Sequence, residues 1–305
     1  MRHSHNLLSS HHSSVSNVAC PDSSVEDQNF VNNKCDGGSG TFSFKHCSWN
    51  NSGLSSHGGA IHLVYSSPQS SISLTIVDCS FLHCHETGDV GGGAISAKCI
   101  GTATVNNSLF YDCRCGMTPT WEDGAGILFY YIYTLPLIKY SSFVSCISSD
   151  DGGGCGIWYG NSSVNYAVDS CHFIKCKGTH ATSSEGGAVI IFQNQMHIGL
   201  SNSLLHDNHA FYGGALDLCD SSLSDFNHPV IFSFFNRNSV PSNGFGNDVY
   251  LSGPLPKHPL LHCFSTPSLV RVYNGNDDWL PQGYAFVEHA YPHLRIYSHH
   301  SLTKK

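Results

Sequence analysis

Cys79-Ser80-Phe81-Leu82-His83-Cys84 is the stretch that decides the fold, because near-copies of it recur along the 305-residue chain. A second motif, Gly92-Gly93-Ala94-Ile95, begins eleven positions after Phe81 and recurs as well. An apolar anchor and a glycine turn therefore alternate along the sequence, which is the pattern of a repeat protein.

The copies of both motifs keep a nearly constant spacing. From Trp49 onward the anchors stand 32, 29, 33, 30, 32 and 30 residues apart, whereas the first step, from Phe30 to Trp49, covers only 19. The counterparts of Phe81 are Phe30, Trp49, Phe110, Phe143, Phe173, Leu205 and Phe235. The glycine motif appears as Gly58-Gly59-Ala60-Ile61, Gly92-Gly93-Ala94-Ile95, Gly124-Ala125-Gly126-Ile127, Gly153-Gly154-Cys155-Gly156-Ile157, Gly186-Gly187-Ala188-Val189 and Gly213-Gly214-Ala215-Leu216.

Apolar residues alternate with other residues after each glycine motif, as in Ile61 and Leu63 or Ile127 and Phe129, and this period of two predicts strands. Short strands repeating every 30 residues or so predict an all-β, right-handed parallel β-helix, a pectin-lyase-like solenoid of about seven coils. We expect each anchor to point inward and to stack on its counterpart in the next coil. The glycine pairs are expected to supply the positive φ angles of the turns. A β-propeller fits less well, because the period is too short and the Trp-Asp signature is missing.

Composition divides the chain into three predicted regions. Residues 1–24 are rich in His and Ser and lack the apolar run of a secretory signal, so we expect a flexible or capping lead-in. Residues 25–251 hold the repeats and form the predicted β-helix. Residues 252–305 carry six prolines between Pro254 and Pro292 and are expected to form a C-terminal cap or the start of a further module.

The charge balance excludes some classes of partner. Lys and Arg number 14 against 22 Asp and Glu, which gives a formal net charge of −8 with neutral His. Because the basic residues are few and unclustered, we expect no nucleic-acid partner. We also expect no membrane span in this chain, and no cofactor.

The paired motifs resemble the repeats of chlamydial polymorphic outer membrane proteins. The resemblance lies in Gly-Gly-Ala-Ile together with Phe-x-x-Asn, here Phe30-Val31-Asn32-Asn33 and Phe235-Asn236-Arg237-Asn238, and it covers roughly residues 25 to 251. Similar right-handed β-helix repeats occur in protist surface proteins. The resemblance implies a surface protein at the cell surface or outside the cell, although no signal peptide is visible. The chain departs from the family where Cys84, Cys113, Cys146 and Cys176 replace the Asn.

These four cysteines fall at one motif position in four successive coils, so we expect a column with one strand spacing between neighbours. A column of buried thiols that pack like small hydrophobic groups is the first interpretation. Disulfides between neighbouring coils are the second, if the protein is exported. Zinc is the third, but no Cys-x-x-Cys pair supports it, and we predict no metal site.

Acidic residues precede several glycine turns and would lie along one edge of the solenoid. They are Asp36, Asp89, Asp123, Asp151 and Glu185. Asp and Asn before Gly favour turns for purely structural reasons. The functional alternative is a set of cation-binding turn carboxylates.

An outward-facing apolar patch is the predicted binding site. If the last residue of each glycine motif faces inward, the next residue faces out, and this outer column is apolar in the middle coils. The predicted patch consists of Leu128, Tyr130, Trp158, Ile190 and Phe192. A large exposed apolar patch marks an interaction surface. The alternative is that the chain's own insertion or C-terminal tail covers it.

We therefore predict a non-catalytic, surface-type recognition or adhesion module with a protein or glycan partner and no catalytic residue. The alternative is a polysaccharide lyase or glycoside hydrolase of the same fold, because the fold alone does not settle function. Against an enzyme stands the lack of a clustered, non-repeating set of acids and bases in the sequence.

Overall fold

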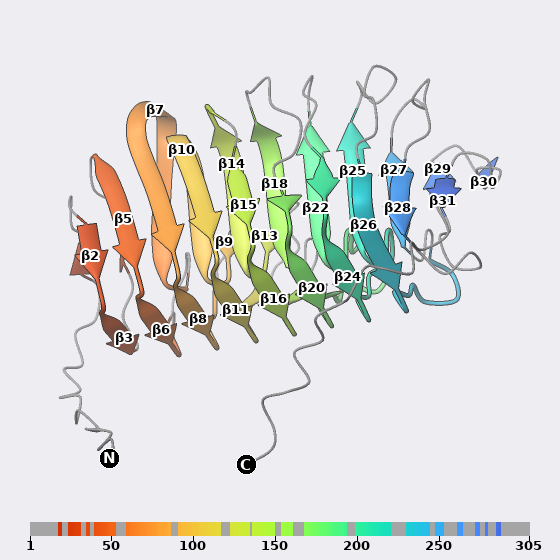
Figure 1. The fold of residues 1–305 in the computed structure, drawn as a ribbon, viewed down its shortest axis with the longest axis horizontal. Coiled ribbons are helices and arrows are strands. Elements are labelled where there is room, and N and C mark those ends of the chain that lie inside the picture. Colours follow the sequence, from red (N-terminus) through yellow and green to blue (C-terminus); the bar gives the residue numbers. More distant parts are fainter. Residues whose placement is uncertain are drawn as a thin grey trace, which may run out of the picture.

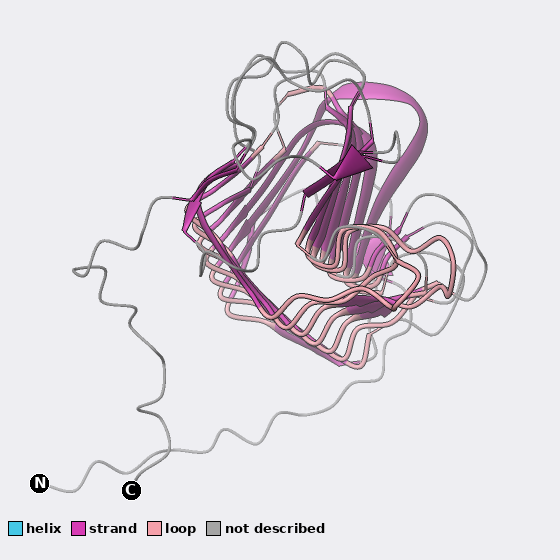
Figure 2. Cartoon of the chain, turned by 90° about the vertical axis from the view of Figure 1, so that its right-hand side faces the viewer, coloured by secondary structure: helices cyan, strands magenta, loops and turns pink. Residues whose placement is uncertain are grey.

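A computed structural model describes residues 18–19, 24–31, 35–36, 40–52, 59–86, 91–116, 123–134, 136–149, 154–160, 168–193, 199–220, 230–244, 248–252, 261–264, 272–274, 278–279 and 285–287. Within these ranges every regular element is a strand, and 26 strands join into one continuous sheet. Successive strands lie side by side along the long axis of the molecule (Figure 1). Seen along that axis, the coils superimpose around a common interior (Figure 2). The chain is an all-β parallel β-helix, as predicted.

Three rows of parallel strands form the walls of the solenoid. The first row follows the glycine motifs and comprises β1 (Val18–Ala19), β4 (Cys35–Asp36), β7 (Ile61–Val77), β10 (Ile95–Asn106), β14 (Ile127–Ile132), β18 (Cys155–Gly160), β22 (Val189–Gln193), β25 (Leu216–Asp220), β27 (Val249–Ser252) and β29 (Val272–Asn274). β7 and β10 are long enough to run on into the second row. That row also contains β2 (Ser24–Glu26), β5 (Thr41–Lys45), β15 (Leu137–Lys139), β19 (Val168–Asp169), β23 (Leu200–Ser201), β26 (Val230–Asn236), β28 (Leu261–Phe264) and β31 (Ala285–Val287).

The third row carries the anchors and is called the anchor row below. It comprises β3 (Asn29–Val31), β6 (Ser48–Asn50), β8 (Ser80–Leu82), β11 (Leu109–Tyr111), β16 (Ser142–Val144), β20 (His172–Ile174), β24 (Leu204–His206) and the end of β26. Two short parallel sheets lie apart from these rows. One contains β12 (Arg114–Cys115), β17 (Ile147–Ser148) and β21 (Lys177–Gly178), and the other contains β9 (Gly91–Gly92) and β13 (Asp123–Gly124). β30 (Asp278–Trp279) is antiparallel to β29.

The anchors fill the interior as a column of stacked rings. Neighbouring rings from Phe30 through Trp49, Phe81, Phe110 and Phe143 to Phe173 have centroids 4.6 to 4.8 Å apart. Leu205 and Phe235 continue the column and are fully buried. The ring spacing equals the distance between hydrogen-bonded strands, because one ring is contributed per coil. The predicted inward stacking of the anchors is confirmed.

Left-handed backbone turns flank the anchor row, and side chains other than glycine adopt them. The residue three positions before the anchor has a positive φ in His46, Asp78, Asn107, Tyr140, Ser170 and Asn202. The residue two positions after the anchor does so in Asn51, His83, Asp112, Ser145, Lys175, Asp207 and Arg237. Asn, Asp and His tolerate this conformation better than most residues, and they hold many of these positions.

The glycine motifs are needed mainly for space, which corrects the prediction about their φ angles. Among the described glycines of these motifs only Gly186 and Gly213 have positive φ. A Cβ at Gly59 would lie 1.9 Å from the carbonyl oxygen of Gly93, and one at Gly154 would lie 2.5 Å from that of Ala188. The chain therefore passes so close to the next coil that no side chain fits there.

The register of β18 also differs from the prediction. Cys155, not Ile157, pairs with Ile127, and Ile157 pairs with Phe129. Cys155 is fully buried and takes the inward position that Ile or Val holds in the other coils. The two-residue shift keeps the inward and outward faces of the strand unchanged, because side chains alternate with a period of two.

The boundaries of the predicted regions stay a prediction. Strands of the parallel stack occur on both sides of residues 25–251, because β1 pairs with β4 near the N-terminus. Near the C-terminus β29 pairs with β27, and β31 pairs with β28.

Candidate functional site

The predicted apolar patch lies in the first row, and part of it is not exposed. Leu128 and Ile190 have 1% and 0% of their surface accessible, and Tyr130 has 9%. Trp158 pairs in register with Tyr130 and Phe192, but their side chains lie outside the described residues. The expectation of exposure was therefore wrong for Leu128 and Ile190, while a binding role for the five residues remains a prediction.

Glycine turns lie close to the backbone of both buried residues. A Cβ at Gly92 would lie 2.8 Å from the backbone nitrogen of Leu128, and one at Gly186 would lie 2.9 Å from that of Ile190. The turns thus lie close to the first row where each strand begins. Sequence alternation alone does not reveal this close approach, because it is made by residues with no side chain.

The predicted turn carboxylates do not form a single row. Asp123 pairs with Gly91, and Glu185 bridges to Tyr212, so these positions do share one edge. Asp36 departs from the prediction, because it pairs with His62 inside the first row. Asp89 and Asp151 lie outside the described residues. Within the described part of the chain no group of three or more His, Cys, Asp or Glu side chains could hold a metal ion.

The predicted cysteine column is present as buried, free thiols. Cys84, Cys113, Cys146 and Cys176 are fully buried and unpaired by disulfides. The sulfur of Cys113 donates to the carbonyl oxygen of Phe81 at 3.5 Å, and that of Cys176 donates to Phe143 at 3.4 Å. Burial raises the pKa of the Cys113 and Cys176 thiols well above the usual value. Cys113 and Cys176 are therefore protonated structural groups, not nucleophiles.

Asn continues the same column in the later coils and makes the same bonds. The side-chain amide of Asn208 donates to the carbonyl oxygen of Phe173 at 3.1 Å, and its oxygen accepts from the Cys176 backbone at 2.9 Å. Asn238 donates to Leu205 and accepts from the backbone of Asn208 in the same way. Where Cys replaces the Asn of the Phe-x-x-Asn motif, the thiol thus takes the place of the side-chain amide as the hydrogen-bond donor.

Sequence analysis missed a second inward column, two residues before each anchor. From the anchor Trp49 onward the position is Cys or Ser: Cys47, Cys79, Ser108, Ser141, Cys171, Ser203 and Ser233. Five of these side chains accept from the backbone nitrogen of the preceding coil, as Ser108 does from Cys79 at 3.2 Å. Ser108 also donates to the carbonyl two residues earlier, that of Asn106, at 2.9 Å. The constant choice of Cys or Ser at this position was the signal that could have revealed it.

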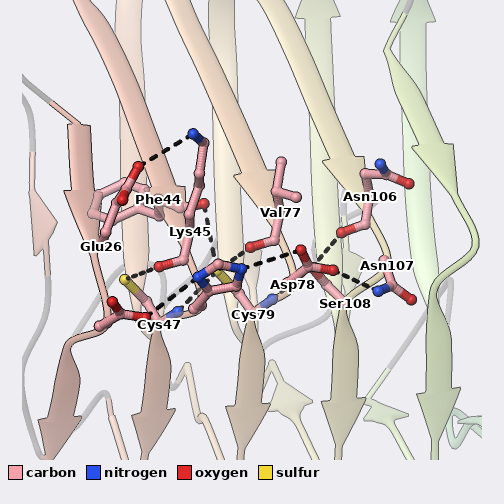
Figure 3. A network of polar contacts seen from close by, with 12 residues as sticks. Glu26, Phe44, Lys45, Cys47, Val77, Asp78, Cys79, Asn106, Asn107 and Ser108 are labelled. Atoms are coloured by element: carbon pink, nitrogen blue, oxygen red, sulfur yellow. Dashed lines mark hydrogen bonds and ion pairs between the residues drawn. The ribbon is translucent and has the colours of Figure 1, made fainter.

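Polar side chains link successive coils on the outside of the turn that precedes the anchor row (Figure 3). His46 lies between Asp27 and Asp78, with nitrogen-to-oxygen distances of 3.3 and 3.4 Å, and Asn107 donates to Asp78. Lys45 contacts Glu26 at 3.2 Å on the neighbouring strand. A shallow groove of about 280 Å³ borders this edge, with Asp78, Asn107 and Tyr140 in its lining.

Two carboxylates on the outer turns have a lowered pKa. Burial alone would raise the pKa of Asp112. Hydrogen bonds from His83 and Arg114 together outweigh this effect, so the pKa lies below its usual range. The pKa of Asp169 is lowered in the same way, against its burial, by Ser201 and Asn202. Both carboxylates are therefore ionised and engaged with neighbouring coils.

The outer face of the anchor row carries an exposed apolar stripe. Leu82, Tyr111, Val144 and Ile174 follow their anchors by one residue and pair in register on four neighbouring strands. Tyr111 is 42% exposed, and the other three are half-buried. The strands that carry the stripe lie along the lower edge of Figure 1. We call this row of four side chains the apolar stripe.

Comparison of the chain with protein-family models, with curated proteins and with solved structures found no match. The class that the structure defines is the parallel β-helix, and the likeness to polymorphic outer membrane proteins rests on short motifs alone. Among the described residues there is no helix of the length and hydropathy needed to cross a membrane.

Proposed function

We propose that this β-helix is a non-catalytic recognition or adhesion module that binds a partner on the outer face of its anchor row. The apolar stripe is the observation that supports this proposal, because Tyr111 keeps 42% of its surface accessible within an in-register row of apolar side chains. Partly exposed aromatic side chains among apolar neighbours are frequent anchors at interfaces. The proposed site thus differs from the patch that the sequence predicted.

The carboxylates of the described turns fit a binding module better than a glycan-cleaving enzyme. A glycosidase needs a general acid whose pKa is raised, so that it holds a proton at neutral pH. The pKa values of Asp112 and Asp169 are shifted in the other direction, although burial opposes that shift. Both carboxylates also use their oxygens to join neighbouring coils.

Catalysis and binding can be separated by one pair of assays on the full chain. The protein is incubated with polygalacturonate and related glycans, with and without calcium, and reducing ends and unsaturated products are measured. We expect no turnover and expect saturable binding to at least one member of a panel of immobilised glycans and peptides, reduced in Tyr111→Ser. Clear turnover of any glycan would overturn the proposal in favour of a lyase or hydrolase.

A further inference from the structure

A basic edge borders the apolar stripe. Among the described residues one to four positions after the anchors, the cations are Arg114, Lys175, Lys177 and Arg237, and the only carboxylates are Asp112 and Asp207. Lys175 and Lys177 are exposed on the same coil, directly after Ile174 of the stripe. Four cations against two carboxylates give this edge an excess of positive charge, although the whole chain carries −8.

The two carboxylates of the edge are already neutralised by their neighbours. Asp112 contacts the guanidinium of Arg114 at 2.9 Å and His83 at 3.0 Å. Asp207 contacts Arg237 at 2.9 Å and His206 at 3.1 Å. Burial lowers the pKa of the nearby His209, and the charge of Lys177 lowers it further. Among the described residues of the edge, Lys175 and Lys177 therefore carry the positive charge that no carboxylate compensates.

We propose that the apolar stripe and the basic edge together dock an extended acidic polypeptide segment, whose apolar side chains lie on Leu82, Tyr111, Val144 and Ile174. Its carboxylates pair with Lys175 and Lys177. This inference rests on the proposed function and names the partner chemistry of the same face. The stripe spans four strands, or about 14 Å at roughly 4.8 Å per strand, which corresponds to about four residues of extended chain.

The combination of aliphatic and cationic groups favours a peptide over other polyanions. Burial of Leu82, Val144 and Ile174 by a partner is favourable only against apolar groups. A polypeptide supplies apolar groups next to carboxylates. An acidic glycan would satisfy the lysines but would cover the aliphatic side chains with hydroxyl groups. A nucleic acid would need more phosphate-neutralising cations than this edge holds.

The test measures binding of a short fluorescein-labelled peptide in which Val and Glu alternate, by fluorescence anisotropy with the full chain. The comparison peptide has Lys in place of Glu. Tyr111→Ser removes the exposed ring of the stripe, and Lys175→Asn with Lys177→Gln neutralises the basic edge. Asn suits position 175 because φ is +57° there. Lys45→Gln with Lys139→Gln is the matched control, since it removes two cations outside the anchor row.

We expect saturable binding of the acidic peptide alone, weakened at least about tenfold by Tyr111→Ser and by the Lys175/Lys177 variant but not by the control. Equal weakening by the control, or no binding of the acidic peptide, would overturn the inference. Binding of polygalacturonate through the same residues without peptide binding would also overturn it, while leaving the recognition role intact. Glycan turnover would instead contradict the proposed function itself. Circular dichroism establishes that each variant remains folded.

Discussion

The ring of Phe143 lies flat against the ring of Phe173, with centroids 4.7 Å apart and an angle of 8° between the ring planes. The two residues are 30 positions apart in the sequence but are in-register partners of β16 and β20. Their stacking shows how the repeat produces the fold: each coil is held by contacts with the equivalent side chain of the next coil. Residues one position away, such as Val144 and Ile174, point outward.

The buried thiols should resist alkylation in the folded protein. Burial raises the pKa of Cys79 and Cys171 to about 12, so almost no thiolate forms at neutral pH. We expect peptides containing Cys79, Cys113, Cys171 and Cys176 to remain unlabelled by iodoacetamide in the native state. They should become fully labelled in urea without added reductant, as measured by mass spectrometry. Labelling in urea that requires a reductant would show disulfides instead of free thiols.

Asn208 should be replaceable by Cys but not by Ala. Ala would leave the Phe173 carbonyl and the Cys176 backbone N–H without their partners inside the solenoid. Each buried, unsatisfied group costs about 1 to 3 kcal/mol. Cys, which occupies the equivalent site in the preceding coil, retains a donor to the carbonyl. We therefore expect Asn208→Cys to lose clearly less free energy of unfolding in urea than Asn208→Ala, and equal losses would contradict the proposed equivalence.

Asp112 should make stability depend on acid pH. Because its pKa in the folded state lies below the unfolded value of about 3.9, its ionised form stabilises the fold above that pH. This contribution is lost as the pH falls through the lowered pKa. Wild type should therefore exceed Asp112→Asn in unfolding free energy at pH 7, with a smaller difference at about pH 3. A difference that grows on acidification would reverse the sign of the argument. Asp27→Asn, at an exposed turn position with the same backbone conformation, is the control.

The sequence predicted the coils and their inward columns because those positions are specified by side chains. Each anchor is large and apolar, and its column follows directly from the 30-residue period. The register of β18 is an exception: the glycine motif aligns Ile157 with Ile127, whereas in the structure the smaller Cys155 pairs with Ile127 and fills that inward place. Turn positions with positive φ, such as Lys175, are not occupied by glycine, so the sequence does not mark them as turns.

The binding surface was harder to predict than the fold. Leu128 and Ile190 face outward by alternation, but both are buried, and glycine turns lie close to their backbone. Leu82, Tyr111, Val144 and Ile174 follow the anchors at a constant offset, so their row is visible in the sequence. What the sequence does not show is that the anchor strands leave this side open to solvent.

The central claim is that the inward side chains hold the coils together while the outward ones are free for recognition, and urea unfolding of Phe173→Ala and Lys175→Ser tests it most directly. Phe173 is fully buried in the ring column, whereas Lys175 is exposed two residues later. Phe173→Ala should lower the free energy of unfolding by about 3 to 5 kcal/mol, because it opens a cavity in a packed interior. Lys175→Ser should lower it by less than about 1 kcal/mol, as is usual for an exposed surface site. Equal losses in the two variants would contradict the division into inward and outward columns.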